Sequence, residues 1–255
     1  MVELILCGCA GKMGAAVQAA VAAREDCQIV AGVDLRQGAA VFPVYEDLAQ
    51  VREKADVIID FSHPSALAGI LDYCDDHPGV AAVLCTTGYT PEQVQSIEEA
   101  SAVLPLFYSR NMSLGVNLLI ELAKKAAAVL GDFDIEIVEA HHNQKIDAPS
   151  GTALMLADAI NEARNQELKY TYDRHSQRKK REKNEIGLHS IRGGTIVGEH
   201  QVILAGQHET LTLSHSAYSK ELFASGAVNA AIFLKGRQPG LYSMKDMVKG
   251  EPDHE

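Results

Sequence analysis

The chain has 255 residues, of which 47% are hydrophobic, so it is long enough for one large domain or two smaller ones with a sizeable core. Its formal net charge of −11 argues against nucleic acid and anionic membranes as main partners. No apolar run has the length of a membrane span, and the N-terminus lacks the basic region of a signal peptide. All five cysteines lie before residue 86 without a C-x-x-C pair, which predicts a reducing cytoplasm, no structural disulfides and no metal site.

A strand, a glycine-rich turn and a helix are predicted at the N-terminus. Residues 2–7 form a short apolar run, and a helical pattern of apolar residues begins at Met13. Between them lies the sequence GCAGKMG, residues 8–14, with the spacing G-x-x-G-x-x-G in place of the commoner G-x-G-x-x-G. This context predicts a loop that binds the pyrophosphate of a dinucleotide at the start of a helix. For the loop alone, a plain glycine-rich turn is an equally good interpretation.

Asp34 strengthens the dinucleotide interpretation. It follows the next predicted strand, residues 28–33, and lies twenty residues after Gly14. An acidic residue at this point is placed to bond both ribose hydroxyls of an adenosine. Arg36 suits a 2′-phosphate but is equally well explained as a surface arginine, so both NADH and NADPH remain possible cofactors.

Strands and helices continue to alternate up to residue 107. Strands are predicted at residues 55–61, 80–85 and 104–107, and helices at residues 64–74 and 91–101, the latter with Thr90 as its N-cap. This alternation predicts a parallel, doubly wound sheet with right-handed crossovers, which binds ligands beyond the carboxyl ends of its strands. The polar segments that fall at this edge are Ser62-His63, Thr86-Thr87-Gly88 and Ser109-Arg110-Asn111-Met112. We therefore expect a cofactor cleft there.

The second half of the chain has a different pattern. A long amphipathic helix is predicted at residues 113–130 and a strand at 134–140, and the β-like runs at 186–192, 196–204 and 209–216 predict antiparallel sheet. The charged run 173–185 predicts a mobile, solvated loop, with a basic flap for an acidic substrate as the alternative. An apolar helix at 223–234 is expected to return to the first domain. The expected domains are therefore residues 1–112 with 222–255, and residues 113–221.

The most informative segment is residues 139–154, EAHHNQKIDAPSGTAL. Two histidines and Lys145 lie between the predicted strand and a helix that begins near Ser150-Gly151-Thr152. The first turn of a helix has unpaired N–H groups and the positive end of the dipole, so it suits a carboxylate. Because neighbouring strand residues point to opposite faces, His141 and His142 are expected to have different roles. For Ser-Gly-Thr alone, an ordinary capped helix is the structural alternative.

These motifs resemble those of the 4-hydroxy-tetrahydrodipicolinate (dihydrodipicolinate) reductase family of bacterial lysine biosynthesis. The resemblance rests on residues 8–14, 139–154 and 191–200 (IRGGTIVGEH), and it continues through Gly226-Ala227-Val228 and Gly240-Leu241-Tyr242. It implies a Rossmann-type parallel-sheet domain and a mixed α+β domain with a largely antiparallel sheet that also builds a homotetramer. It also implies that hydride from NADH or NADPH reduces 4-hydroxy-tetrahydrodipicolinate, a small dicarboxylate, to tetrahydrodipicolinate with loss of water, in diaminopimelate and lysine biosynthesis.

The resemblance further implies a role for individual residues. His141 would be the catalytic acid or base with Lys145 as its partner, and the substrate would be held by His142, Ser150, Gly151 and Thr152. The residues implied to contact the cofactor are Gly8, Cys9, Ala10, Gly11, Lys12, Met13, Asp34, Cys85, Thr86, Thr87, Ser109, Arg110, Asn111 and Met112. Cys85 stands where the family often has glycine, so a side chain there is expected to crowd the nicotinamide side of the cleft.

Two other functions remain open from the residues themselves. Another two-domain NAD(P)-dependent dehydrogenase, acting on a sugar or an amino acid, would share the first domain but would not require the segment from Lys145 to Thr152. A non-catalytic NADH-sensing module would need a surface for a partner or for DNA, and this acidic chain offers no basic stripe for DNA. The enzyme is expected in the cytoplasm.

Overall fold

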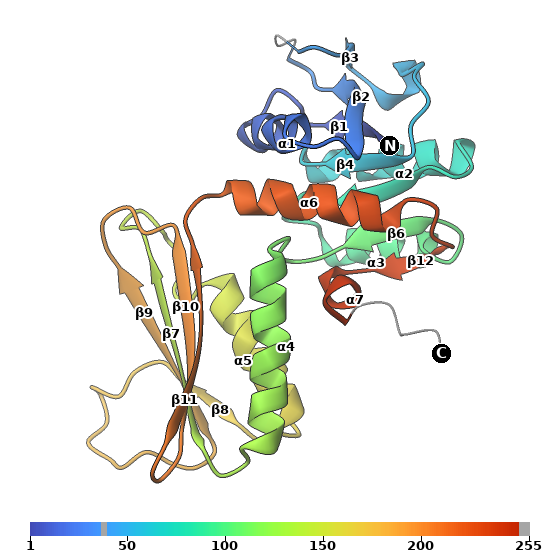
Figure 1. Ribbon diagram of the computed structural model, residues 1–255. Helices are drawn as coiled ribbons and strands as arrows, with labels where there is room; N and C mark the ends of the chain where they lie inside the picture. Colours follow the sequence, from blue (N-terminus) through green and yellow to red (C-terminus); the bar gives the residue numbers. More distant parts are fainter. Residues whose placement is uncertain (37–39, 250–255) are drawn as a thin grey trace. The chain divides into compact units, whose positions relative to one another are not determined.

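The structure is a computed structural model that describes residues 1–36 and 40–249 (Figure 1). The chain divides into two compact units, which are described one at a time: Met1–Leu114 with Glu221–Glu255, and Gly115–Lys220. The first unit therefore takes its chain from both sides of the second. No helix in the described ranges is long and apolar enough to cross a membrane.

The first unit is built on a seven-stranded parallel sheet with the strand order β12-β6-β5-β4-β1-β2-β3. Its strands are β1 (Val2–Cys7), β2 (Cys27–Val33), β3 (Val44–Tyr45), β4 (Val57–Asp60), β5 (Ala81–Leu84), β6 (Pro105–Tyr108) and β12 (Gly240–Tyr242). The predicted parallel, doubly wound sheet is confirmed. The sequence pattern does not predict β3 and β12, because two and three residues are too few to show a period.

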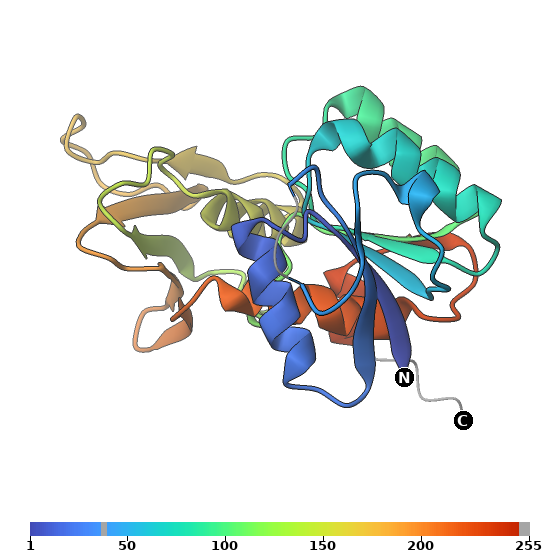
Figure 2. The ribbon, with the colours of Figure 1, turned by 90° about the horizontal axis from the view of Figure 1, so that it is seen from above.

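Helices cover both faces of this sheet, because its strands are apolar on both sides (Figure 2). In β1, Leu4 and Leu6 pack with the helices α1 (Lys12–Ala22) and α6 (Glu221–Leu234). Ile5 and Cys7 point the other way and pack with α2 (Leu67–Asp76) and α3 (Pro91–Ala100). The short elements η1 (Leu48–Gln50), η2 (Pro64–Ala66) and α7 (Met244–Lys249) complete the unit.

Local sequence explains where these helices begin. The predicted N-cap of α3 is confirmed: Thr90 and Gln93 form a capping box, and Pro91 occupies the first turn. The predicted helix at residues 64–74 is instead η2 followed by α2, and the His63 side chain caps η2 by accepting from the Ser65 N–H.

The second unit has a five-stranded sheet with two helices on one face. The strand order is β11-β10-β7-β9-β8. Its elements are α4 (Leu114–Val129), β7 (Asp134–His141), α5 (Gly151–Ala163), β8 (Lys169–Thr171), β9 (Glu185–Arg192), β10 (Gly198–Ala205) and β11 (Thr210–Ala217). Residues of α4 and α5 pack on Ile135, Ile137, Leu188 and Val202, so the core lies on the helix-covered face.

This second sheet is more mixed than the sequence predicts. Strands β7, β10 and β11 pair antiparallel, but β9 pairs parallel with both β7 and β8. The chain passes from β7 through α5 to β8, and from β8 through residues 172–184 to β9, and each of these crossover connections returns the next strand parallel. The remaining part of the predicted fold class, an α/β chain with a parallel sheet and a second mixed sheet, is confirmed.

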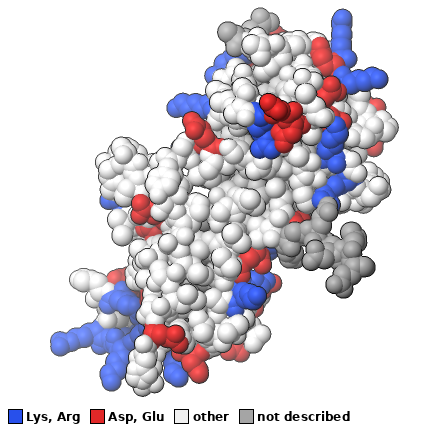
Figure 3. Space-filling view, viewed as in Figure 1, with Lys and Arg blue, Asp and Glu red and all other residues white. Residues whose placement is uncertain are grey.

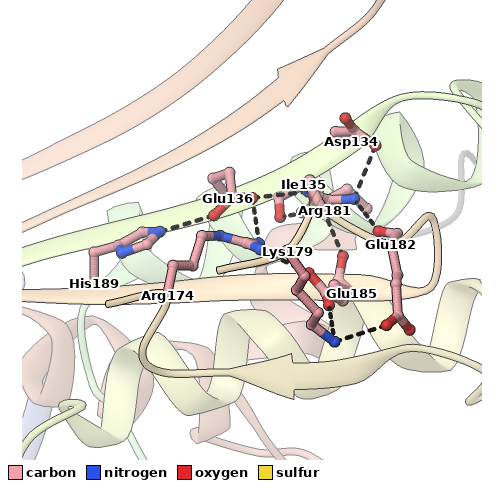
Figure 4. Close-up of polar contacts among 9 residues, drawn as sticks. All are labelled: Asp134, Ile135, Glu136, Arg174, Lys179, Arg181, Glu182, Glu185 and His189. Atoms are coloured by element: carbon pink, nitrogen blue, oxygen red, sulfur yellow. Dashed lines mark hydrogen bonds and ion pairs between the residues drawn. The ribbon is translucent and has the colours of Figure 1, made fainter. Parts of the chain in front are cut away.

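The charged run between β8 and β9 is tied to the sheet at two arginines (Figure 4). Arg181 donates to Glu136 at 2.9 Å and to Asp134 at 2.8 Å, and Arg174 donates to Glu136 at 3.2 Å and Glu185 at 2.8 Å. Other Lys and Arg side chains of the run are exposed, and Figure 3 shows basic side chains gathered over this loop. The run is therefore attached to the outer face of β7 and is not a wholly solvated loop.

We predict that Gly226 is essential to the first unit. A Cβ there would overlap the carbonyl oxygen of Met112, so Gly226→Ala should force α6 away and cost about 1–3 kcal/mol of unfolding free energy. Gly69 is the matched control, because it is an exposed helical glycine whose added Cβ would meet nothing within 4 Å. Gly69→Ala should stabilise by about 0.5–1 kcal/mol, since alanine restricts the unfolded chain. Urea unfolding of both variants tests this, and equal stabilities would contradict it.

Candidate functional site

The glycine-rich loop is a tight turn that requires glycine at two positions. Gly8 has φ of 77°, and a Cβ there would lie 2.5 Å from the Phe61 carbonyl oxygen. A Cβ on Gly14 would overlap the carbonyl oxygens of the turn itself. The helix α1 then begins after Gly11, which provides no side-chain cap. Its first N–H groups are therefore available to an anion at the carboxyl edge of the sheet, as a pyrophosphate requires.

Asp34 lies beside this loop at the end of β2. Its carboxylate accepts from the Ala10 N–H at 3.0 Å and from the Arg36 N–H at 2.9 Å. The Arg36 guanidinium lies 3.6 Å from the same carboxylate and is largely exposed. The acid that the sequence places near a ribose thus contacts the backbone of the turn predicted to hold the pyrophosphate.

A cavity of about 630 Å³ lies at the carboxyl edge of the parallel sheet. The residues that line it are Met13, Phe61, Ser62, His63, Pro64, Cys85, Thr86, Thr87, Gly88, Tyr108, Ser109, Arg110, Asn111, Met112 and Phe223. The structure therefore brings together the three polar segments that the strand order predicts to meet. Thr86 contributes a buried hydroxyl to the lining of this cavity.

Two cysteines implied as cofactor contacts have buried side chains. Cys9 packs in the core between the sheet and α1, so only its backbone is offered to a ligand. The Cys85 sulfur lies 3.9 Å from the Val83 carbonyl oxygen, which directs it back along β5. Burial and the nearby charge of Asp60 raise the pKa of the Cys85 thiol, so it is neutral. Cys85 still lines the cavity, but its sulfur is turned toward the strand that carries it.

In the second unit, a buried carboxylate organises the end of β7. Glu139 accepts from Nδ1 of His141 at 2.6 Å and from the Ser150 N–H at 3.1 Å. Arg192 donates a hydrogen bond to each of its oxygens, from Nη1 to Oε2 at 2.8 Å and from Nη2 to Oε1 at 2.7 Å. Burial favours the neutral carboxyl, but the hydrogen bonds from Arg192, Ser190 and His141 outweigh it and lower the pKa of Glu139 to about 2. Glu139 is therefore an anion that can only accept hydrogen bonds.

His200 is a second buried residue at this place. Its Nε2 lies 3.0 Å from the Ser150 hydroxyl, and its ring centroid lies 5.2 Å from that of His141. Burial, with a smaller contribution from His141, lowers the pKa of His200 to about 4, so the ring is neutral near pH 7. The Ser150 hydroxyl also caps α5 by accepting from the Ala153 N–H at 3.2 Å. The hydroxyl of Ser150 thus has partners inside the protein, and it stabilises the helix start.

The other residues implied by the resemblance surround this cluster. Lys145 pairs with Asp147 at 2.8 Å, and His142 is half-buried just beyond the end of β7. Gly151 is exposed, and a Cβ there would meet nothing within 4 Å, so the chain is open where α5 begins. The structure therefore places His141, Ser150 and Gly151 around one helix start.

Sequence reasoning did not identify Glu139, Arg192 and His200. Glu139 was detectable, because it precedes His141 by two residues on a strand and therefore shares its face. Arg192 and His200 come from distant strands, and the register brings them in: Arg192 lies opposite His141, and His200 lies opposite Glu139.

Comparison with known proteins gives a consistent result over nearly the whole chain. A model of the N-terminus of dihydrodipicolinate reductase matches residues 2–112, and one of its C-terminus matches residues 115–248. The 4-hydroxy-tetrahydrodipicolinate reductase of Caldanaerobacter subterraneus is 51% identical over 249 residues, covering 98% of this chain and 99% of that one. The reductase of the same name from Clostridium novyi is 46% identical over 253 residues, covering 98% and 100%. A solved dihydrodipicolinate reductase from Paenisporosarcina, with dipicolinate bound, is 29% identical with a TM-score of 0.80, covering 95% and 97%.

Proposed function

The chain belongs to the dihydrodipicolinate reductase family and is an NAD(P)H-dependent reductase of 4-hydroxy-tetrahydrodipicolinate in diaminopimelate and lysine biosynthesis, and we propose that His141 and Lys145 move the protons of that reaction. The observation that carries this proposal is the state of the His141 ring. Its Nδ1 is bonded to a buried carboxylate, while its Nε2 makes no hydrogen bond within the described residues. One ring nitrogen is thus fixed and the other is left to exchange a proton.

The residues of the first unit fit a nicotinamide dinucleotide. The loop of residues 8–14 and the start of α1 suit its pyrophosphate, Asp34 suits a ribose, and the cavity with the Thr86 hydroxyl suits the remaining part. The bound cofactor supplies hydride. The protein residues bind and orient it, and Cys85 adds a neutral wall to the cavity.

The start of α5 is proposed to hold a carboxylate of the substrate. Ser150 fixes the first turn through its cap, and the open chain at Gly151 allows a ligand to approach the backbone. Thr152 adds a hydroxyl, and the half-buried His142 adds a polar ring. A solved relative holds dipicolinate, which is a cyclic dicarboxylate and fits such a site.

We assign proton transfer to His141 and Lys145, which are not among the groups proposed to hold the substrate carboxylate. In the net reaction hydride replaces the hydroxyl of the substrate and water leaves, so one proton must reach the departing oxygen, and a histidine exchanges protons near neutral pH. Among residues 1–36 and 40–249, Asp147 is the one ion-pair partner of the Lys145 ammonium, which therefore has further N–H donors for a substrate.

We predict that His141→Ala and Lys145→Ala each lower kcat by about 10²–10⁴-fold with little change in cofactor affinity, as expected for loss of an acid or base. Their effects should be less than additive if both serve one proton-transfer step. Thr152→Val should chiefly raise KM, because it removes a hydroxyl from the substrate site. Steady-state kinetics with the pyruvate–aspartate-semialdehyde condensation product measures all three. Unchanged turnover in both alanine variants would show that this segment is not the active site.

The position of Asp34 predicts that NADH is used at least as well as NADPH. Its carboxylate would repel a 2′-phosphate, while the exposed Arg36 softens this discrimination. Asp34→Ala should therefore weaken the binding of NADH more than that of NADPH. Fluorescence titration with each cofactor measures the two losses, and equal losses would mean that Asp34 does not touch the ribose.

We also propose that β9, β10 and β11 build a homotetramer in the cytoplasm. The face of this sheet opposite the helices carries Val138, Ile191 and Ile203, and β11 is an edge strand, so apolar surface and a strand edge are available to other copies. All five cysteines are unpaired, which suits a reducing compartment.

Sedimentation velocity at micromolar concentration should show four chains, and Ile191→Asp should shift the protein toward smaller species because it places a charge on the sheet face. Val129→Asp is the control, because Val129 is an exposed residue at the end of α4. A wild-type protein that sediments only as a monomer would rule the assembly out.

A further inference from the structure

The pair formed by Glu139 and Arg192 does more than fill the end of the sheet. Glu139 is 1% exposed, and its two oxygens are shared among His141, Ser150 and both terminal nitrogens of Arg192. One of these nitrogens, Nη2, also donates to the Asp147 carbonyl oxygen at 2.7 Å. A single ion pair therefore contacts the His141 ring, the loop that carries Lys145, and the residue that caps α5.

The charge on Glu139 decides which nitrogen of His141 can react. An ionised carboxylate only accepts hydrogen bonds, so the nitrogen that faces it must carry a hydrogen. His141 therefore keeps its Nδ1 protonated in both of its charge states, and the proton that comes and goes is the one on Nε2. Without Glu139, either nitrogen is free to carry the single hydrogen of the neutral ring.

Arg192 balances the same charge. The guanidinium bonds both oxygens of the carboxylate that lies 2.6 Å from Nδ1 of His141, so its positive charge opposes the attraction of that carboxylate for a positive ring. The two residues thus act on His141 in opposite directions.

We propose that Glu139 and Arg192 are positioning residues for proton transfer, which together fix the His141 tautomer and set the pH range in which it donates a proton. This inference rests on the proposed role of His141 as the acid or base. The polar groups around His141 and the adjacent His200 come from each neighbouring element. They are Glu139 on β7, Ser190 and Arg192 on β9, His200 on β10, His215 on β11, Lys145 in the loop and Ser150 at the start of α5. Of the histidines among them, His200 is neutral near pH 7, so it adds no charge there.

The chain contains a matched control on the opposite face of β7. Glu136, three residues before Glu139, also bonds a histidine and arginines: His189 at 2.7 Å, Arg181 at 2.9 Å and Arg174 at 3.2 Å (Figure 4). The same chemistry therefore occurs twice on one strand, but the second copy has no part in the proposed site.

The test is the pH profile of kcat/KM for two charge variants. The alkaline limb is the part of the profile where kcat/KM falls because the acid loses its proton. In Glu139→Gln the protonated His141 ring no longer has a carboxylate beside it, so this limb should move to lower pH by about one unit or more. The value of kcat should fall about 10²-fold. In Arg192→Met the carboxylate is no longer balanced, so the same limb should move to higher pH. Glu136→Gln should leave both the limb and kcat at the wild-type values, with its oligomeric state checked by sedimentation.

Arg192→Lys keeps the positive charge but loses the two-pronged hydrogen bond to Glu139. The alkaline limb of this variant should therefore stay near the wild-type pH, while kcat falls. This variant also serves if Arg192→Met does not fold, as judged by circular dichroism. A Glu139→Gln limb that overlays the wild type, or Glu139→Gln and Arg192→Met limbs that move in the same direction, would overturn the inference. If His141→Ala leaves turnover unchanged, the proposed function fails. If that variant is impaired but the limb of Glu139→Gln does not move, only this inference fails.

Discussion

A buried negative charge is the constraint on which the second unit depends. A carboxylate out of water is tolerated only when its oxygens are bonded, and Glu139 meets that condition with contacts from β7, β9 and the start of α5. Each contact also fixes a group that the proposed chemistry needs. Satisfying one charge therefore orders a ring, a loop and a helix end together.

The strand β7 carries this cluster because of its alternation. Ile135, Ile137, Glu139 and His141 share the face that α4 and α5 cover, so the apolar core passes directly into the polar site. Strand β10 repeats the arrangement with Leu204, Val202 and His200. The packed end of the sheet holds the strands rigid, and the rigid strands in turn fix the side chains at the polar end, which preorganises the site.

The sequence predicts features that depend on local order. The turn at Gly8, the cap at Thr90 and the loops at the sheet edge follow from spacing and from the alternation of strands and helices. Arg192 and His200 could not be placed in this way, because their positions depend on a register between strands about 50 residues apart. The sequence does not predict the parallel pairing of β9 for the same reason, since it depends on two crossover connections, α5 and residues 172–184, whose paths become visible only in three dimensions. The charged composition of residues 173–185 predicts a solvated loop and does not reveal that Glu136 binds two of its arginines.

The split chain of the first unit has a consequence for the order of synthesis. One face of the parallel sheet, with Leu4, Leu6 and Ile59, packs against α6, which is made more than a hundred residues after β6. Until that helix leaves the ribosome, α1 is the only one of the two helices that can cover this apolar face, whereas all of residues 115–220 are already available. The second unit can therefore complete its core first. The incomplete first unit therefore exposes part of an apolar sheet face, which is prone to aggregate until α6 packs with Gly226 against Met112.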